Sequence, residues 1–468
     1  MTGSIAHGMR AALALALPLL VCACAGIAVP RLDAPLPQRW RHAEPAAGAM
    51  PVDLRGWWHA FHDPALDALV DEALRRNLQL GEAREHLQAA RERYRSAGTV
   101  GLPRFGAKTE DAIDPDASAS FFVAGFDASW ELNLFGRGTA LHRQARGALD
   151  AGVAEWQQAR VSLVAEVVRD WLSLQAGRQQ QAVLESELEL KQRASAISQT
   201  RVRLQLAAPV ERDMAEMGVS EAKAALAGAT AENEVLEGQL AMLLGRNEPL
   251  PDWSRPGTLP VLGMVGLDQV PADLLRTRPD IAAAEARVLT AAGEAGEARA
   301  NLLPRLGIGG SVVWSTNLTT HRQTQDNALL TLGPMIDIPL FDWGARQADF
   351  RAGKHELAAS VFAYRQAVLE GVADVEAALA RLQQQAARQA EQGAAHAALV
   401  RALQAQDTRV RLGLAAPADR IQAQWAVSQS DLAGIDTTLA RDLAFVGLYK
   451  ALGGAPLPST AADAEAVR

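Results

Sequence analysis

Two parts of the chain alternate between apolar and polar residues, as strands with one apolar face do. Between residues 122 and 134, apolar side chains occupy the even positions and mostly polar ones the odd positions. Residues 330–340 repeat this alternation, and residues 104–112 and 305–314 are weaker candidates for partner strands. Because strand side chains point alternately to opposite faces, the pattern predicts two amphipathic strand pairs.

Long proline-free stretches follow the strands. Residues 116–208 and 340–416 contain no proline and are rich in Ala, Leu, Gln, Glu and Arg. Each can hold a helix of about 65–70 residues, on the order of 100 Å long. Apolar residues at steps of three and four, such as Leu163, Val167 and Trp171, indicate packing seams like those of coiled coils.

The chain also repeats itself. Residues 201–212, RVRLQLAAPVER, recur as residues 409–420, RVRLGLAAPADR, with nine of the twelve positions identical. Segments 102–106 and 131–135 recur in the same order at offsets of 201 and 206. Each half is therefore predicted to contain a helix, a strand pair, a very long helix, a turn and a further helix.

The N-terminus has the pattern of a lipoprotein signal. One arginine precedes an apolar run that ends at Ala23 and is too short to span a bilayer. Cys24 follows the small Ala23, as the acylated cysteine of a bacterial lipobox does. Residues 1–23 are predicted to be the signal peptide and residues 24–55 an acylated linker. The alternative is ordinary signal cleavage with an incidental cysteine.

Beyond Cys24, no apolar run reaches the roughly 18–20 residues of a membrane helix. The mature chain is then either soluble or enters a membrane as strands. Four strands cannot close a barrel, since the smallest closed barrels need about eight. Three chains would supply twelve, with the apolar face toward lipid and Asp127, Glu131 and Asn133 toward a wet lumen. A soluble sheet with one wetted face is the alternative.

Composition narrows the function. The chain of 468 residues has 54 acidic and 46 basic side chains, a net charge of −8, which argues against a nucleic-acid-binding protein. Aromatic residues make up only 5% of the chain, whereas about one residue in five is alanine. Small aliphatic residues favour long, closely packed helices.

Several short motifs, taken in order around the duplication, resemble the TolC-like outer-membrane factors of tripartite efflux and secretion systems, in their lipoprotein branch. They are WWHAFHDP at 57–64, WELNLFGR at 130–137, RPDI at 278–281, GP at 333–334 and PLFDWG at 339–344. Asn133 departs from the family pattern, in which Asp is frequent. The resemblance covers essentially the whole mature chain.

The resemblance implies a mainly α fold with a small β part, assembled as a trimer. A twelve-stranded outer-membrane β-barrel would stand on a periplasmic α-helical barrel. The expected domains are repeat 1 at 56–250, a linker at 251–269, repeat 2 at 270–453 and a flexible tail at 454–468. Long helices 139–206 and 344–414 would leave the barrel, and residues 209–246 and 417–453 would return toward it.

The resemblance further implies that the two duplicated turns form the periplasmic tip, where an adaptor protein docks. The matching residues are Arg203, Leu204, Leu206, Arg411, Leu412, Gly413 and Leu414. Gln205 stands where the second turn has Gly413, which predicts a stiffer first turn.

Family members constrict the tip with acidic rings. Asp419 matches one such position and Glu211 is its counterpart in the first half, while Gln422 leaves a second ring absent. Three copies of Asp419 around a threefold axis would attract cations. The alternative is an ordinary acidic residue in the first turn of a helix after Pro417.

No catalytic constellation is present. His59 and His62 lack a third metal ligand, and the glycine-rich segment 307–310 lies in a strand pattern without a following Lys-Ser/Thr. The chain is therefore predicted to have no enzymatic activity and to need no cofactor.

The predicted function is a passive trimeric duct of a tripartite efflux pump, which exports small toxic compounds or drugs. Its partners would be a periplasmic adaptor, an inner-membrane pump and outer-membrane lipid, without nucleic acid. The exit duct of a type I protein secretion system is the alternative within the same architecture. A periplasmic coiled-coil lipoprotein without a channel is a third possibility, which the strand pattern disfavours.

Overall fold

The computed structural model describes residues 26–33, 40–42, 54–112, 121–255, 257–260, 262, 278–317 and 329–454. The predicted signal peptide with Cys24, part of the linker at 251–269 and nearly all of the tail at 454–468 lie outside these ranges. Among the described helices, none is both long enough and apolar enough to cross a bilayer.

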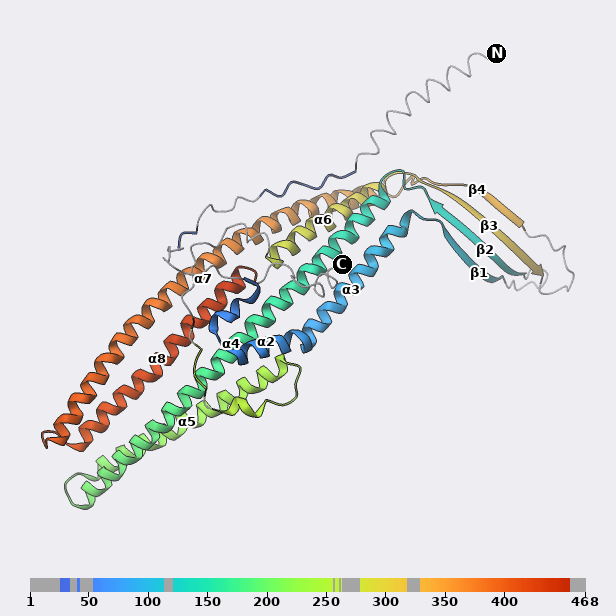
Figure 1. The fold of residues 1–468 in the computed structure, drawn as a ribbon. Coiled ribbons are helices and arrows are strands. Elements are labelled where there is room, and N and C mark those ends of the chain that lie inside the picture. Colours follow the sequence, from blue (N-terminus) through green and yellow to red (C-terminus); the bar gives the residue numbers. More distant parts are fainter. Residues whose placement is uncertain are drawn as a thin grey trace, which may run out of the picture. The chain divides into compact units, whose positions relative to one another are not determined.

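The order of elements is duplicated, as the repeated segments predicted (Figure 1). After the 3-10 helix η1 (Leu54–Phe61), the first copy contains α2 (Pro64–Arg76), α3 (Leu78–Gly98), η2 (Thr99–Gly101), β1 (Arg104–Ala112), β2 (Phe121–Glu131), α4 (Arg137–Arg203), α5 (Pro209–Leu243) and η4 (Pro251–Ser254). The second contains α6 (Pro279–Ala300), β3 (Arg305–Asn317), β4 (Leu329–Asp337), α7 (Ala345–Arg411) and α8 (Pro417–Ala451). Helices α4 and α7 each have 67 residues, which confirms the predicted long helices and the mainly α fold with a small β part.

The described residues divide into two compact units. Unit 1 draws on the described residues within 26–33, 85–154 and 282–367, and therefore contains the sheet and α6 from its fourth residue onward. Unit 2 draws on the described residues within 40–84, 155–281 and 368–454, and therefore contains α2, α5, α8 and the first three residues of α6.

The four strands form one antiparallel sheet in the order β1-β2-β3-β4. The register places Phe126 opposite Ala107 and Val312, and Asp127 opposite Gly106 and Ser311. Since residues directly opposite each other share a face, the predicted alternation is confirmed as one apolar and one more polar face. The apolar face is exposed: the large side chains on it are Phe105, Phe126, Trp130, Ile308, Trp314, Leu330, Leu332 and Ile336.

Two of the predicted strands were too long. Strand β2 ends at Glu131 and β4 at Asp337, three residues before the alternation does in each case. The backbone explains the first difference, because Asn133 adopts a left-handed conformation with φ of 48° that no strand can contain.

Helices α4 and α6 of unit 1 approach closely at glycine. A β-carbon on Gly147 would lie 2.6 Å from the Thr290 nitrogen, and one on Gly293 would lie 2.6 Å from the Gln144 nitrogen. Larger residues would collide with backbone here. The predicted close packing of helices through small residues is therefore present at this contact.

The Trp-Trp motif builds the core of unit 2. Trp57 stacks on Tyr449 of α8 with ring centroids 5.0 Å apart, and Phe61 meets Phe445 edge-on at 5.6 Å. Asp63 caps α2 by accepting the Ala65 and Leu66 amides, and it also accepts a 2.7 Å hydrogen bond from Trp171 Nε1 on α4. The motif thus joins the start of the first repeat to α4 and to the end of the second.

Candidate functional site

The two helical hairpins, α4–α5 and α7–α8, each end in a turn (Figure 1). The two turns have the same backbone hydrogen bonds. The Leu206 amide donates to the Arg201 carbonyl at 2.8 Å, and the Leu414 amide donates to the Arg409 carbonyl at the same distance. The preceding residue of each turn donates a second bond, of 2.9 and 3.0 Å respectively. This pair of bonds closes a helix C-terminus in the Schellman motif, which needs one left-handed residue.

Gln205 and Gly413 supply that left-handed residue, with φ of 58° and 71°. Glycine adopts this conformation without steric cost, whereas a residue with a β-carbon does so less readily. Gln205 therefore adopts the left-handed conformation at a higher free-energy cost than a glycine would, and the first turn keeps the same hydrogen bonds as the second.

Apolar side chains project from both turns. Leu204, Leu206, Leu412 and Leu414 are 61%, 68%, 68% and 67% exposed. Arg203 and Arg411 donate to the hydroxyls of Thr200 and Thr408, at 3.5 and 3.2 Å. The residues predicted for adaptor contact thus lie in two equivalent turns with exposed apolar side chains. Gly413 is the left-handed residue of the second turn.

Asp419 has the geometry of a helix-capping residue. Its Oδ2 accepts the Ala416 amide at 3.0 Å, and its own amide donates to the Ala416 carbonyl at 3.0 Å. The ordinary reading of Asp419 as a first-turn acid of α8 therefore has a direct structural basis. The side chain is exposed and forms no ion pair with the described part of the chain, so the capping bond leaves its negative charge uncompensated.

Glu211, the counterpart in the first hairpin, is in a different environment. Its Oε1 lies 2.9 Å from Arg201 Nη1, so the charge is paired within the chain. In the second hairpin Arg420 instead pairs with Asp407, at 2.6 Å. The two turns therefore have the same backbone hydrogen bonds but different ion pairs, Arg201–Glu211 in the first hairpin and Arg420–Asp407 in the second.

The predicted lumen residues occupy three different settings. Asp127 lies in the middle of β2 on the polar face, between Gly106 and Ser311. Glu131 ends β2 and pairs with Arg137 of α4 at 3.4 Å. Asn133 lies beyond the strand, so its assignment to the polar face of a strand is wrong. Its Oδ1 is buried, in the turn that leads into α4.

One buried polar cluster between α4 and α8 has no signature in the sequence. Glu187 of α4 is 8% exposed and accepts hydrogen bonds from Trp425 Nε1 at 2.7 Å and from Gln429 Nε2 at 2.9 Å, both on α8. Lys191 Nζ lies 4.4 Å from the centroid of the Trp425 ring. We call these four residues the α4–α8 clasp. No short sequence motif links Glu187 to Trp425, because the two residues are 238 positions apart.

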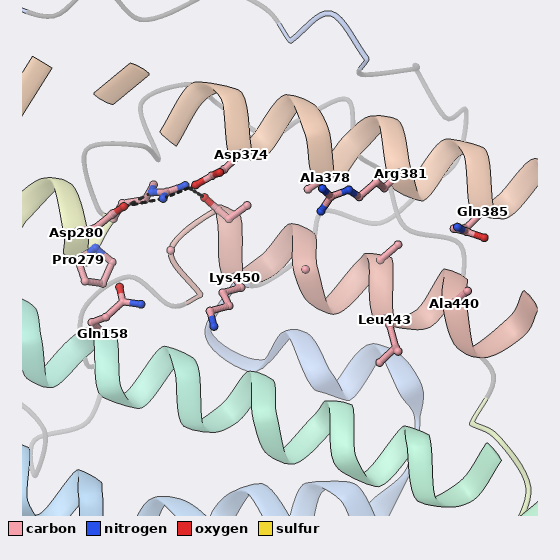
Figure 2. Close-up of a pocket in the computed structure, with 15 residues that line it drawn as sticks. Gln158, Pro279, Asp280, Asp374, Ala378, Arg381, Gln385, Ala440, Leu443 and Lys450 are labelled. Carbon is pink, nitrogen blue, oxygen red and sulfur yellow. Dashed lines mark hydrogen bonds and ion pairs between the residues drawn. The ribbon is translucent and has the colours of Figure 1, made fainter. Parts of the chain in front are cut away.

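The RPDI motif forms a second polar network around the buried Arg278. Arg278 donates to Asp280 at 2.7 Å, to Asp374 of α7 at 3.1 Å and to the Ala451 carbonyl at 2.6 Å (Figure 2). Burial opposes ionisation of Asp280, but hydrogen bonding and the charge of Arg278 outweigh it and hold the pKa of this carboxyl below its ordinary value. The network ties the start of α6 to α7 and to the end of α8.

The described residues contain no group of three or more His, Cys, Asp or Glu side chains that could hold a metal ion. His59 hydrogen-bonds Asp67 at 2.7 Å through Nδ1. The glycine-rich segment lies within β3, where a β-carbon on Gly310 would come 2.9 Å from the Thr331 carbonyl oxygen.

Known proteins share this architecture over nearly the whole chain. The pyoverdine export outer membrane protein OpmQ of Pseudomonas aeruginosa is 29% identical over 472 aligned residues, covering 93% of this chain and 95% of OpmQ. The solved outer-membrane channel OprN superposes with a TM-score of 0.77 at 25% identity, covering 92% of this chain and 99% of OprN. The open state of the Neisseria gonorrhoeae MtrE outer membrane channel gives a TM-score of 0.76 at 26% identity, covering 91% and 98%.

The family model of outer membrane efflux proteins matches residues 69–246 and 270–454. The two matched segments correspond to the two copies of the duplicated unit, from α2 to α5 and from α6 to α8. The exposed turns, the clasp and the RPDI network all lie within them. The chain belongs to the outer membrane efflux protein family.

Proposed function

We propose that three copies of this chain form the passive outer-membrane channel of a tripartite efflux pump, for small toxic compounds or drugs. A periplasmic adaptor and an inner-membrane transporter would complete the pump and supply its energy. The observation that carries the proposal is the sheet of unit 1, whose apolar face is exposed and whose outer strands, β1 and β4, each have one edge without a partner strand in the described chain.

The sheet is suited to closure with other copies. Strands β1 and β4 form its two edges, and an unpaired edge exposes backbone donors and acceptors. Phe105, Leu330 and Leu332 on the apolar face are 83%, 73% and 79% exposed. Three sheets joined edge to edge would give twelve strands, a closed barrel with an apolar outer surface.

Helix α5 offers a second surface for assembly. Every residue of one seam, at alternating steps of four and three, is exposed: Val210, Met214, Met217, Glu221, Ala224, Gly228, Ala231, Val235, Gly238 and Met242. All but Glu221 are apolar or glycine, and open space lies above Gly228 and Gly238. This is the spacing of a coiled-coil seam with residues small enough for a close neighbour. A helix of a second copy fits it.

Assembly can be tested by charge on this seam. We expect Ala231→Glu to reduce trimer recovery in detergent by about tenfold, since it would bury an unpaired carboxylate at the contact. Lys223→Glu is the control, because Lys223 is exposed on α5 outside the seam and its charge changes more. Sedimentation of both variants gives the oligomeric state. Equal trimer recovery would contradict the assembly, and a wild-type monomer would contradict the channel.

Lipidation at Cys24 is also part of the proposal. Arg143 of α4 donates to the Ile27 carbonyl at 2.6 Å, and Ile27 and Leu32 pack on the cluster of Val288, Ala291, Ala292 and Leu357. An acyl chain three residues before Ile27 would therefore start beside the unit that carries the sheet.

Metabolic labelling with palmitate tests this site. The label is expected to be lost in Cys24→Ser and retained in Cys22→Ser, which alters the other cysteine of the chain. Label that persists in Cys24→Ser would contradict the proposal.

The exposed turns are proposed as the adaptor contact, and Asp419 as the gate charge. Since Arg201 pairs with Glu211 and no described cation pairs with Asp419, the two acids should contribute unequally. In planar bilayers, Asp419→Ala should lower cation selectivity by about two- to fivefold, and Glu211→Ala should change it less. Unchanged selectivity in Asp419→Ala would remove this residue from the gate.

A further inference from the structure

Helices α7 and α8 of unit 2 leave an open groove of about 510 Å³ between them (Figure 2). Small residues line it, namely Ala378 on α7 with Ala440, Ala444, Gly447 and Ala451 on α8. A β-carbon added to Gly447 would meet no atom within 4 Å, so the space above this residue is empty. We call this cavity the α7–α8 groove.

The polar groups of the groove are incompletely matched. Arg278 is neutralised by Asp280 and Asp374 at one end. Arg381 and Lys450 also line the groove, and neither forms an ion pair with the described residues. Gln385 adds a buried Oε1 without a hydrogen-bond partner. Three cations against two carboxylates give the groove a net charge of +1, and the two cations without an ion-pair partner among the described residues, Arg381 and Lys450, line it together with small residues.

Residues 40–42 cover a different face of α7. The Arg41 amide donates to Glu376 at 2.8 Å, and Gln383 donates to the His42 carbonyl at 2.7 Å. Neither Glu376 nor Gln383 lines the groove. Residues 40–42 thus pack against α7 and do not fill the α7–α8 groove.

We propose that residues 455–468 of the same chain occupy the α7–α8 groove, with Asp463 and Glu465 facing Arg381 and Lys450. The described chain ends at Gly454, and the preceding residue, Gly453, already lines the groove. The proposal goes beyond the efflux function, because residues 455–468 lie outside the segments that match the family model.

Length and composition support this occupant. The groove follows α8 from Ala451 to Ala440, about 17 Å at 1.5 Å per residue. Nine residues from Gly454 to Asp463 can reach up to about 30 Å, enough to place the acidic residues at any level of the groove. Residues 455–468 are mostly Ala, Pro and other small residues and carry two acids against one arginine, which complements a narrow cationic site.

Engineered disulfides test the docking in the purified full-length protein. Ala464→Cys lies between the two acids, and we pair it with Gly447→Cys in the groove. The control pairs it with Gly434→Cys, which is also on α8 and also has open space above it but lies about 20 Å along the helix. Because a disulfide needs the two Cα atoms within about 7 Å, only the first pair should form an intramolecular bond under mild oxidation.

Charge reversal tests the recognition. Asp463→Lys with Glu465→Lys should slow the 464–447 cross-link by about three- to tenfold, and adding Arg381→Glu with Lys450→Glu should restore it. A protein without the engineered cysteines corrects for Cys22 and Cys24, and unchanged trimer sedimentation and efflux show that the channel is intact. Equal cross-linking at 447 and 434, cross-links only between chains, or no effect of charge reversal would each overturn the proposal.

Discussion

Replacing Glu187 by alanine is expected to lower the free energy of unfolding by about 2–4 kcal/mol, because it leaves Trp425 Nε1 and the Gln429 amide without an acceptor in a partly buried site. Within the α4–α8 clasp, Glu187 accepts hydrogen bonds from both Trp425 and Gln429 and so joins α4 to α8. The midpoint of urea unfolding of the detergent-solubilised protein measures the effect.

The neighbouring Glu189 provides a matched control. It pairs with Arg193 at 2.9 Å on the surface of the same helix, with a side chain that is 67% exposed. Exposed pairs contribute roughly 0–1 kcal/mol, so Glu189→Ala should hardly shift the midpoint. Glu187→Gln keeps one acceptor and should fall between the two. Equal midpoints for Glu187→Ala and Glu189→Ala would show that the clasp does not stabilise the hairpins.

Asp442 of α8 is expected to make stability depend on pH in the opposite sense to a surface carboxylate. Its side chain is completely buried, and Oδ2 has no hydrogen-bond partner. Burial raises the pKa of this carboxyl to about 6, although Arg441 at 2.9 Å favours the charged form. Since the ordinary value is 3.8, the folded protein takes up a proton that the unfolded chain does not bind between about pH 4 and 6.

The sign follows directly from that difference. The stabilising contribution of protonated Asp442 is fully present below pH 4 and is lost as the pH rises through 6. Above that pH, ionised Asp442 costs up to about 3 kcal/mol. Asp442→Asn should therefore raise the free energy of unfolding by about 1–3 kcal/mol at pH 7.5 and by much less at pH 4.

A control is available in a second Arg–Asp neighbour pair. Arg212 and Asp213 have the same sequence relation at 2.7 Å, but the Asp213 side chain is 61% exposed. Asp213→Asn should leave the pH profile between 4 and 7.5 close to that of the wild type. The profiles come from thermal unfolding followed by circular dichroism at each pH. A parallel profile for Asp442→Asn and the wild type would contradict the buried carboxylate as the cause.

The sheet shows how far a local pattern can predict structure. Alternation at Phe126 and Asp127 correctly placed these residues on opposite faces, since the period of two is a property of the extended backbone itself. The same pattern overran the end of β2, because Leu132 and Leu134 continue the alternation although Asn133 bends the chain. Hydrophobic period records which way side chains would point, and it contains no information on where a left-handed residue stops the strand.

The turns show a different balance. The repeated segments predicted both bends and their residues, and the hydrogen bonds of Leu206 and Leu414 are the same in each. The partners of the two acidic residues could not be predicted from the repeat, since Glu211 forms an ion pair with Arg201 whereas Asp419 caps its own helix. Which partner an exposed side chain takes depends on distances of a few ångströms between helices.

The sequence by itself determined the duplicated order of elements, the two 67-residue helices, the amphipathic strands and the family, because propensity, hydrophobic period and repeated motifs act within a few residues of the chain. Only the tertiary structure decided that Glu187 binds Trp425 of a helix 238 positions away, that Asp442 is buried with one oxygen unpaired, and that α7 and α8 leave a groove. These features depend on how each long helix is rotated about its axis, and that rotation is set by the summed packing of distant side chains.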